Sequence, residues 1–598
     1  MLNIRNQARL ILKPFEDYFS DDLIIRALCR QRIKAAEKRN EREYVDRLAG
    51  YRQPNPGEPI DKPTDTINQL LPPRKKWSQF RPRFRKPHQD VNQASLYQAT
   101  IKLREREPNA GWVVELNKFI AQIRHRVLES KSFAFSAPKV CGIVKEKGGH
   151  NYRALCLFSL EDGIINGLTA KYLRELLDPL FEASSFAFRV RQADKPMPTH
   201  HAAFEKIFEL KSRNPHQDYH VAECDIRGFY DSVDHGVAKH QLQCLAERSQ
   251  DPLHPRAMLI FEAYLNCYSF PKNVLQEALP ELIKKDPAGN FPWPEKALGK
   301  LHTEPRSQRI GVPQGGALSC VIANIVLDLA DKRIKETAQH LDAQIHYLRY
   351  CDDMVLISRN GNKCRSVYQA YLRALKDLKL PYHKPELVEH YDKKFWESKS
   401  KKPYRWTGKK GPGCVPWVQF VGYQVRHDGL VRIKKKSVQK HLDKLVETTG
   451  KVRAQLMDRS KRQPTLERPN MRATKREILS SFRRKLASMG VGRVNPHQPA
   501  DSPLPKCWAN GYHALHNKPF ITTFLKQFDR ERERQIRRLE RANILEGEGR
   551  NIGKGSRRNR YPAKGPVFSY YAQFKDLGGI ALLKKPNRFS APQNPPAH

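Results

Sequence analysis

The chain has 598 residues, and its 108 Lys and Arg side chains outnumber 63 Asp and Glu side chains, which gives a net charge of +45. Such an excess usually indicates a polyanionic partner, and we expect nucleic acid rather than an anionic membrane surface. No stretch approaches about eighteen consecutive apolar residues, which excludes a transmembrane helix. The eleven cysteines are dispersed without a C-x-x-C pair. We therefore expect reduced thiols in a cytoplasmic protein, and neither structural zinc nor disulfides.

The N-terminal region is predicted to be mainly helical. Residues 1–50 are rich in charge and contain helix-favouring text such as "RQRIKAAEKRNEREYVDRL". A proline-rich stretch near 52–65 follows, and its composition indicates a linker. The basic text at 72–89, "PPRKKWSQFRPRFRKPHQ", lacks periodicity, and we interpret it as an extended arm on a phosphate backbone or as a solvated loop. Apolar residues recur at helical spacing over 111–128, which predicts a further helix.

The region 131–430 is the most strand-rich part of the chain. The segments "YHVAECDIRGFYDSVDH" and "IHYLRYCDDMVLISR" both carry β-favouring residues around aspartates. Between them lie a Gly/Pro turn, "GVPQGGALS", and a helix-like run, "CVIANIVLDLADKRIKE". Residues 390–415 are interpreted as a basic inserted loop. Beyond Lys434 the sequence is predicted to be helical and is strongly basic.

Two adjacent carboxylates, Asp352 and Asp353, interrupt the apolar run "YLRYCDDMVLIS". Burying like charges together is costly, because each loses hydration and each repels the other. A two-strand reading of 345–358 places both aspartates and Cys351 at a bend, where the pair could hold a divalent cation such as Mg²⁺. Asp225, at the end of the strand "HVAEC", is the natural third donor for two ions. The alternative is one hydrogen-bonded turn aspartate and one exposed aspartate.

The order and separation of three motifs resemble those of reverse transcriptases: "AECDIRGFYDSVDH", "GVPQGGALSCVIANIVLD" and "YLRYCDDMVLIS". The resemblance is strongest to the bacterial branch related to group II intron enzymes. Four further segments, "KEKGGHNYRALCL", "SSFAFRV", "LKLPYHKPEL" and "FVGYQV", are similar to other motifs of that family. The resemblance covers about 131–431. It implies an α+β right-hand polymerase fold with fingers, a palm built on an antiparallel sheet, and a helical thumb.

The resemblance also implies a division of the chain. We expect a basic, mainly helical N-terminal extension over 1–130, and fingers and palm over 131–430. A helical thumb with C-terminal helices is expected over 431–545, followed by a partly disordered basic Gly/Arg/Pro-rich tail over 546–598.

The resemblance assigns roles to individual residues. Asp225 and Asp352 would ligate two Mg²⁺ ions, for which Mn²⁺ could substitute, with Asp353 beside them as a weaker ligand. Tyr230 would exclude the 2′-hydroxyl of ribonucleotides, and Asp231 and Asp234 are expected to cap helix starts. The remaining nucleotide contacts would be Lys147 or Lys145, Arg153, Gln314, Gly315 with Gly316, and Lys384, and the primer grip would be Phe420, Gly422 and Tyr423.

The biological setting is less constrained by the residues. No H-N-H-type nuclease, integrase or RNase H carboxylate set is evident, which favours a defence-associated reverse transcriptase that copies a dedicated structured non-coding RNA into DNA during phage infection. The expected partners are that RNA, the DNA product, dNTPs, and a second copy or a second system protein. The alternatives are an intron maturase-like or CRISPR-associated reverse transcriptase, a catalytically silent RNA-binding scaffold, and an RNA-templated RNA polymerase. Three tail tyrosines are candidates either for protein priming or for stacking on RNA: Tyr561, Tyr570 and Tyr571.

Overall fold

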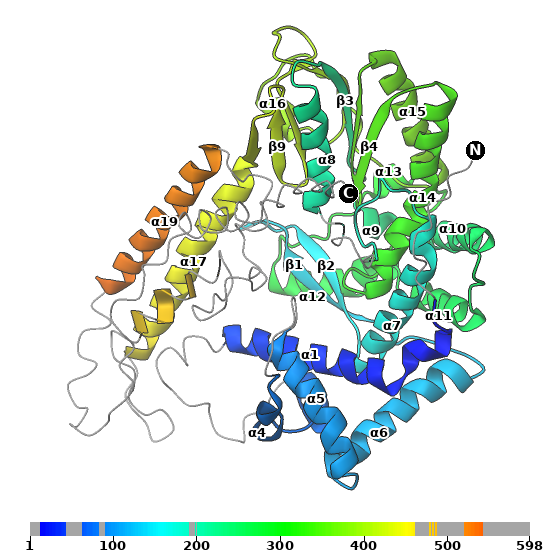
Figure 1. Cartoon of the computed structure of the whole chain (residues 1–598), viewed down its shortest axis with the longest axis vertical. Coiled ribbons are helices and arrows are strands. Elements are labelled where there is room, and N and C mark those ends of the chain that lie inside the picture. The colour runs from blue at the N-terminus through cyan, green and yellow to red at the C-terminus, as the bar shows by residue number, and fades with distance from the viewer. Residues whose placement is uncertain are drawn as a thin grey trace, which may run out of the picture.

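The structure of the chain is a computed structural model (Figure 1). It describes residues 12–42, 62–82, 90–146, 148–190, 198, 200–460, 478–479, 481–483, 485–486, 489 and 519–541. The predicted tail 546–598, with its three tyrosines, lies outside these residues, as do most of the proline-rich stretch near 52–65 and Lys147.

Helices form the N-terminal part of the chain, at the bottom of Figure 1. They are η1 (Phe15–Phe19), α1 (Asp21–Arg42), α3 (Lys62–Gln69), α4 (Arg74–Trp77), η2 (Ser78–Phe80), α5 (Val91–Arg106), α6 (Gly111–Arg124) and η3 (His125–Glu129). The helices predicted within 1–50 and over 111–128 are therefore confirmed. The extended-arm interpretation is wrong for 74–80, because the buried Trp77 ring anchors this short helical segment against the core.

The predicted fingers region contains an antiparallel hairpin of β1 (Lys139–Val144) and β2 (Tyr152–Leu157). One face of the hairpin packs on buried Tyr268, Phe270 and Phe291. The helices that follow between this hairpin and residue 300 are α7 (Leu160–Leu177), η4 (Asp178–Leu180), α8 (His200–Arg213), α9 (Phe229–Ser232), α10 (His235–Arg248), α11 (Pro255–Asn266), η5 (Pro271–Gln276), α12 (Ala278–Lys285) and α13 (Glu295–Leu298). Several begin at a side-chain cap, as in α7, where Ser159 accepts a hydrogen bond from the amide of Asp162.

The predicted palm region contains a five-stranded sheet in the order β4-β5-β3-β6-β7. Its strands are β3 (Tyr219–Cys224), β4 (Ile345–Tyr350), β5 (Asp353–Ser358), β6 (Lys401–Trp406) and β7 (Cys414–Val415). All neighbouring strands pair antiparallel except β6 and β7, which are parallel. The predicted loop over 390–415 is therefore wrong in part, because it contains α16 (Lys393–Glu397) and strands β6 and β7.

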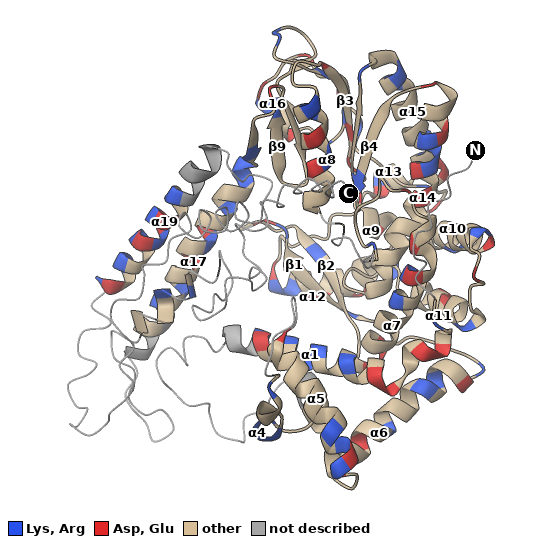
Figure 2. Cartoon of the chain, viewed as in Figure 1, with Lys and Arg blue, Asp and Glu red and all other residues tan. Residues whose placement is uncertain are grey.

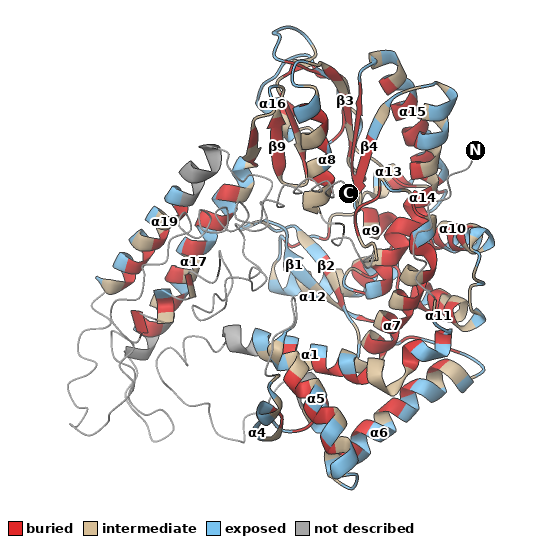
Figure 3. Cartoon of the chain, viewed as in Figure 1, coloured by how far each residue is buried: buried red, intermediate tan, exposed pale blue. Residues whose placement is uncertain are grey.

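Both faces of β5, an interior strand of the sheet, are covered. Met354 and Leu356 face the core shared with α14 (Ala317–His340) and α15 (Gly361–Asp377), whereas Val355 and Ile357 face α8 (His200–Arg213) and a second small sheet. This burial explains the nearly continuous apolar sequence of β5. Figure 3 shows the buried residues concentrated on these strands and on α14. The core of α14 and α15 continues into the N-terminal helices as one cluster.

The second sheet is antiparallel, in the order β10-β9-β8, and leads into the C-terminal helices. Its strands are β8 (Trp417–Phe420), β9 (Tyr423–Arg426) and β10 (Val431–Ile433). Helix α17 (Lys435–Ser460) follows directly, as predicted beyond Lys434, and packs beside α19 (Pro519–Glu540). Both helices carry Lys and Arg residues along their length (Figure 2). Within the described residues, no helix combines the length and apolar character needed to cross a membrane.

Candidate active site

The turn between β4 and β5 carries the two adjacent aspartates. Tyr350 and Asp353 are paired across the hairpin, so Cys351 and Asp352 form its tip. Cys351 has a φ of 59°, in the left-handed region that non-glycine residues rarely adopt. The predicted bend at 351–353 is confirmed, and its backbone is strained.

Strand β3 brings Asp225 to this turn. Because Cys224 is paired with Met354, the residues that follow and precede them, Asp225 and Asp353, lie at facing positions on neighbouring strands. The Asp225 amide donates a 3.0 Å hydrogen bond to Ser400 Oγ, and its carboxylate lies 3.7 Å from Lys399 Nζ. A cavity of about 900 Å³ is lined by both aspartates. Strand pairing therefore joins two segments that lie more than a hundred residues apart in sequence.

The three carboxylates influence one another's charge. Burial, reinforced by repulsion from Asp352 and Asp225, raises the pKa of Asp353 to about 7. Burial also raises the pKa of Asp352, with a further contribution from Asp225. Ionising this group of like charges without a counter-ion is unfavourable, so a bound cation would stabilise it.

The carboxylates of the turn and of β3 could supply part of the ligand shell of Mg²⁺. In the described part of the chain, no three His, Cys, Asp or Glu side chains are gathered closely enough to hold a metal ion by themselves. Mg²⁺ is commonly held by one or two carboxylates, with waters and substrate phosphates completing its shell. Asp225 with Asp352 or Asp353 would supply the protein's share, so the site fits an ion that arrives together with a phosphate-bearing substrate.

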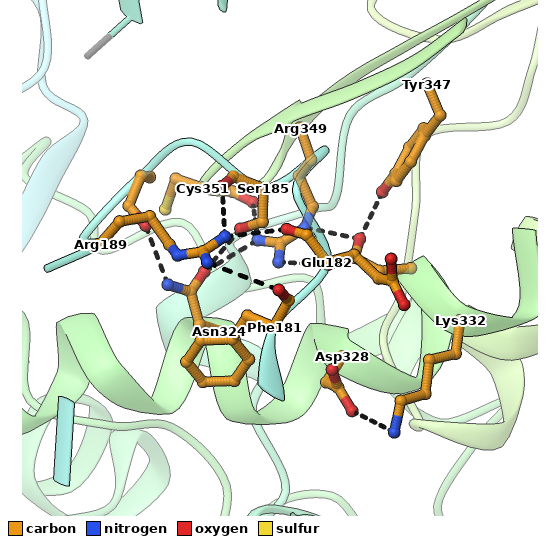
Figure 4. Close-up of polar contacts among 12 residues, drawn as sticks. Phe181, Glu182, Ser185, Arg189, Asn324, Asp328, Lys332, Tyr347, Arg349 and Cys351 are labelled. Atoms are coloured by element: carbon orange, nitrogen blue, oxygen red, sulfur yellow. Dashed lines mark hydrogen bonds and ion pairs between the residues drawn. The ribbon is translucent and has the colours of Figure 1, made fainter. Parts of the chain in front are cut away.

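A buried ion pair between β4 and α14 supports the strained turn (Figure 4). The Arg349 guanidinium makes a bidentate contact with Asp331 of α14, with Nη2–Oδ2 and Nε–Oδ1 distances of 2.6 and 2.8 Å. The two side chains are 0% and 1% exposed. Arg349 Nη1 also donates to Asn324 Oδ1 at 3.2 Å and to the carbonyl of Cys351 at 3.0 Å. The guanidinium thus connects α14 directly to the backbone of the aspartate turn.

Tyr230 lies beside the same turn, at the start of α9. Its hydroxyl is 3.4 Å from Cys351 Sγ, and its carbonyl accepts a 2.8 Å hydrogen bond from the amide of Val312. The ring is half-buried against the core, and burial raises the pKa of its hydroxyl. Tyr230 therefore stands between the aspartate turn and the "GVPQGG" segment. Its part in sugar discrimination stays a prediction.

The "GVPQGG" segment packs closely against β2 and α11. Gln314 Nε2 donates a 2.7 Å hydrogen bond to Asp231 Oδ1, and the Gln314 carbonyl accepts one from the amide of Cys156. Gly315 has a φ of 118°, and a Cβ there would lie 2.8 Å from the Cys156 carbonyl. A Cβ at Gly316 would overlap the Tyr264 hydroxyl, at 1.8 Å. Only glycine fits at these two positions.

The two predicted caps have different outcomes. Asp234 caps α10, because its side chain accepts a hydrogen bond from the amide of Val237. The prediction for Asp231 is wrong, since its carboxylate is buried and bound by Gln314 rather than by a helix amide. Burial raises the pKa of Asp231 to about 6, and the charges of Lys145 and Arg153 oppose this shift.

The predicted triphosphate contacts lie around these groups. Arg153 lies on β2, opposite Ile143, and its charge opposes the rise in the pKa of Asp352. Lys145 follows β1, and burial lowers its pKa. Lys384 lies just beyond the segment that contacts Asp225, since the amide of His383 donates to the Asp225 carbonyl. Their contacts with a nucleotide remain predictions.

The proposed primer grip is a tight turn between β8 and β9. Val421 and Gly422 both have positive φ, 43° and 90°, and line the cavity. Phe420 and Tyr423 are buried, and the centroid of the Tyr423 ring stacks 4.0 Å from that of Phe204. The buried side chain of Tyr423 therefore packs against Phe204 of α8, and the backbone of the turn faces the cavity. Contact of this turn with a primer stays a prediction.

Sequence reasoning missed Arg349 and Lys399. Arg349 lies within the "YLRYCDDMVLIS" motif and Lys399 within the predicted basic loop 390–415, but their partners, Asp331 and Asp225, come from other elements. An arginine in an otherwise apolar strand, in the text "YLRY", is the signal that could have indicated a buried ion pair.

Comparison with known proteins places these motifs in a family. Residues 143–408 match the family described as reverse transcriptase (RNA-dependent DNA polymerase). No curated protein matches the chain. Similar solved structures include apo telomerase from Candida tropicalis truncated from its C-terminal domain (13% identity, 57% of this chain and 68% of that chain, TM-score 0.29). Others are telomerase from Candida albicans in complex with a TWJ fragment of telomeric RNA (11%, 76% and 73%, 0.29) and apo telomerase from Candida tropicalis (11%, 75% and 73%, 0.32).

The family match spans most of the β1–β2 hairpin, the "GVPQGG" segment and all three aspartates. The chain therefore carries a reverse transcriptase domain over residues 143–408, and this domain indicates an RNA-directed DNA polymerase, a nucleotidyltransferase.

Proposed function

We propose that the domain extends a DNA strand on an RNA template with two Mg²⁺ ions held by Asp225 and Asp352, with Asp353 beside them. The observation that carries this proposal is the facing position of Asp225 and Asp353 on paired strands, together with the raised pKa of the buried aspartates. When bound, the ions would lower the pKa of the primer 3′-hydroxyl and neutralise charge on the triphosphate.

The chain's own groups would orient the substrates. Arg153 and Lys145, or Lys147 outside the described residues, would contact the triphosphate from the fingers hairpin. Gln314, held by Asp231, would face the nucleotide, and the turn at Gly422 would support the primer backbone. Lys384 would contribute a further cation to the nucleotide site.

The melting temperature of the protein should respond to metal binding, and this measurement does not require nucleotide incorporation. The pKa of Asp353 is raised to about 7 in the folded state, above the ordinary value of about 3.9, so the folded state binds more protons between these values. Stability without metal should therefore fall as pH rises from about 4 to 7. In the presence of a dNTP and without a primer, we expect Mg²⁺ to raise the melting temperature at pH 8 by several degrees and to have little effect at pH 5.

The control for this measurement is Asp328→Asn. Burial raises the pKa of Asp328 on α14 to about 7 as well, but it is paired with Arg248 away from the turn. In this variant the stability should depend less on pH, and the melting temperature should still rise on addition of Mg²⁺. A Mg²⁺ response that survives in Asp352→Asn, Asp353→Asn would show that the ion binds elsewhere.

Tyr230→Ala should relax sugar discrimination. Removing the ring from its place beside Cys351 opens space under the sugar, and steric exclusion of one small group is worth about tenfold or more. Single-nucleotide incorporation of dNTPs and rNTPs would measure the ratio, with Tyr230→Phe as the control that keeps the ring. An unchanged deoxy/ribo ratio in Tyr230→Ala would place the discriminating group elsewhere.

For the biological setting, we propose a bacterial, cytoplasmic enzyme that copies a dedicated non-coding RNA during antiphage defence. The net charge of +45 supports a large RNA partner, and the ten cysteines in the described residues are unpaired thiols. A maturase-like or CRISPR-associated enzyme is the second candidate. Protein priming by Tyr561, Tyr570 or Tyr571 is proposed from the sequence alone.

Sequencing the nucleic acid that copurifies with the protein tests this setting. One abundant structured RNA with complementary DNA is the expected result. Spliced intron RNA, or RNA without any complementary DNA, would contradict it in favour of a maturase or a silent scaffold.

A further inference from the structure

One segment of the predicted fingers region has no role in the assignments above. Residues 286–293, "DPAGNFPW", lie between α12 and α13, and we call them the bridging segment. Helix α12 lies beside the β1–β2 hairpin, below it in Figure 1. The segment begins with a tight turn, in which the Gly289 amide donates a 2.7 Å hydrogen bond to the Asp286 carbonyl. After this turn the chain contacts the hairpin.

The carboxylate of Asp286 holds two side chains of the hairpin. It accepts a 2.8 Å hydrogen bond from Nδ1 of His150 and another of 2.8 Å from the hydroxyl of Tyr152. These hydrogen bonds lower the pKa of Asp286, and the one from His150 contributes most. His150 precedes β2 and Tyr152 is the first residue of β2. One carboxylate therefore fixes the point at which the chain returns from the hairpin tip.

Backbone hydrogen bonds extend this contact. The Asn290 amide donates to the His150 carbonyl, and the Tyr152 amide donates to the Asn290 carbonyl, both at 2.8 Å. The Phe291 side chain is buried, and its ring centroid lies 6.3 Å from that of Tyr152 in a T-shaped arrangement. The bridging segment therefore pairs with the beginning of β2 as a short additional strand would.

This part of the hairpin carries the cations that are predicted to contact the triphosphate. Arg153 directly follows Tyr152, and the Lys145 amide donates a 2.8 Å hydrogen bond to the carbonyl of Asn151. Successive side chains of a strand point to opposite faces. Tyr152 therefore turns toward the bridging segment and Arg153 turns away from it, so a shift of the Tyr152 backbone would move Arg153 as well.

The other end of the bridging segment contacts the opposite side of the predicted nucleotide site. Trp293 Nε1 donates a 2.8 Å hydrogen bond to the Asp231 carbonyl, and the Trp293 ring stacks on Phe270 with centroids 5.8 Å apart. The Asp231 carboxylate in turn accepts the hydrogen bond from Gln314. The segment thus connects the strand of Arg153 with the residue that holds Gln314.

Stability alone gives little reason for the contact between Asp286 and His150. The His150 side chain is 60% exposed, and exposed ion pairs contribute little to the free energy of unfolding. Fixed geometry matters more for a reaction, since displacing a contacting group by about 1 Å can reduce the rate by about a hundredfold.

We propose that the bridging segment sets the separation between the cations of the hairpin and Gln314, so that Asp286 and Trp293 are positioning residues for the incoming dNTP. This inference rests on the proposed function, in which Arg153, Lys145 and Gln314 contact the nucleotide. Asp286 acts through the hairpin, and Trp293 acts through Asp231 and Gln314.

Steady-state primer extension with Asp286→Ala tests this proposal. We expect the KM for dNTP to rise about tenfold while kcat and the affinity for the template–primer stay near their native values, because only nucleotide contacts are displaced. Asp286→Asn should restore most of the native KM, since its amide oxygen accepts from Tyr152 and its amide nitrogen can donate to neutral His150. Glu281→Ala is the matched control, because it removes a carboxylate of α12 that pairs with Lys284 instead.

Trp293→Phe tests the other end of the segment. It removes the Nε1–H donor and keeps an aromatic ring against Phe270. The KM for dNTP should rise about fivefold, which is the effect of one typical hydrogen bond. Because Trp293 acts through Gln314, this effect should be much smaller in a Gln314→Ala background. Fully additive effects of the two substitutions would overturn the role of Trp293.

The outcomes separate this inference from the proposed function. The rise in melting temperature caused by dNTP with Mg²⁺ and without a primer should require about tenfold more dNTP in Asp286→Ala. This titration still decides the inference if the native protein fails to incorporate dNTPs. A native KM in Asp286→Ala, or a decrease in kcat alone that follows a lower melting temperature, would overturn the inference even if polymerisation is confirmed. Tyr152→Phe, which removes only the hydroxyl, provides the same test if Asp286→Ala fails to fold.

Discussion

Replacing Asp352 and Asp353 together by asparagine should abolish nucleotide incorporation. The ions they would hold stabilise charge in the transition state by several kcal/mol, and each 1.4 kcal/mol is worth about tenfold in rate. A reduction of about a thousandfold or more is therefore expected. Primer extension on an RNA template with labelled dNTPs measures it.

The same variant should keep its fold and its affinity for RNA. Asparagine has nearly the shape of aspartate, and it removes the buried charge and the repulsion between carboxylates, which together raise the pKa of both aspartates. In EDTA its melting temperature should therefore equal or exceed that of the native protein at pH 8. Asp328→Asn, which changes a buried carboxylate outside the site, should retain incorporation. Native-level synthesis in the double variant would remove the active-site assignment.

Arg349→Met should have the largest effect on stability. It leaves the fully buried Asp331 without its bidentate partner, and breaking such a pair costs about 3–5 kcal/mol. The variant also frees the carbonyl of Cys351, so the aspartate turn loses its support. Chemical denaturation should show the decrease in stability, and the surviving folded protein should incorporate dNTPs slowly.

A second substitution separates the two roles of Arg349. Arg349→Met combined with Asp331→Asn leaves no uncompensated charge, and we expect most of the stability to return. The hydrogen bond from the guanidinium to Cys351 is still missing, so kcat should stay low while KM for dNTP changes little. Arg126→Met, which breaks an ion pair with the buried Asp162 outside the aspartate turn, is the matched control and should lose stability while kcat is kept. Full recovery of kcat in the combined variant would make Arg349 a purely structural residue.

The amino-acid sequence by itself determined the catalytic motifs and most local structure. The bend at Cys351, the strand before Asp225 and the helices over 111–128 and beyond Lys434 follow from periodicity and composition, which depend only on neighbouring residues. The reverse transcriptase domain could be predicted because its motifs can be read directly from the sequence in a fixed order. The match over 143–408 confirms this domain.

Tertiary structure alone decided which distant side chains meet. The pairing of β3 with β5 places Asp225 opposite Asp353, and packing of α14 against β4 gives Arg349 its partner Asp331. Asp231, which the sequence predicts as a helix cap, instead accepts a hydrogen bond from Gln314, a residue of the distant "GVPQGG" segment. Long-range contacts of this kind depend on strand register and on the burial of charge, and neither leaves a periodic signal in the sequence.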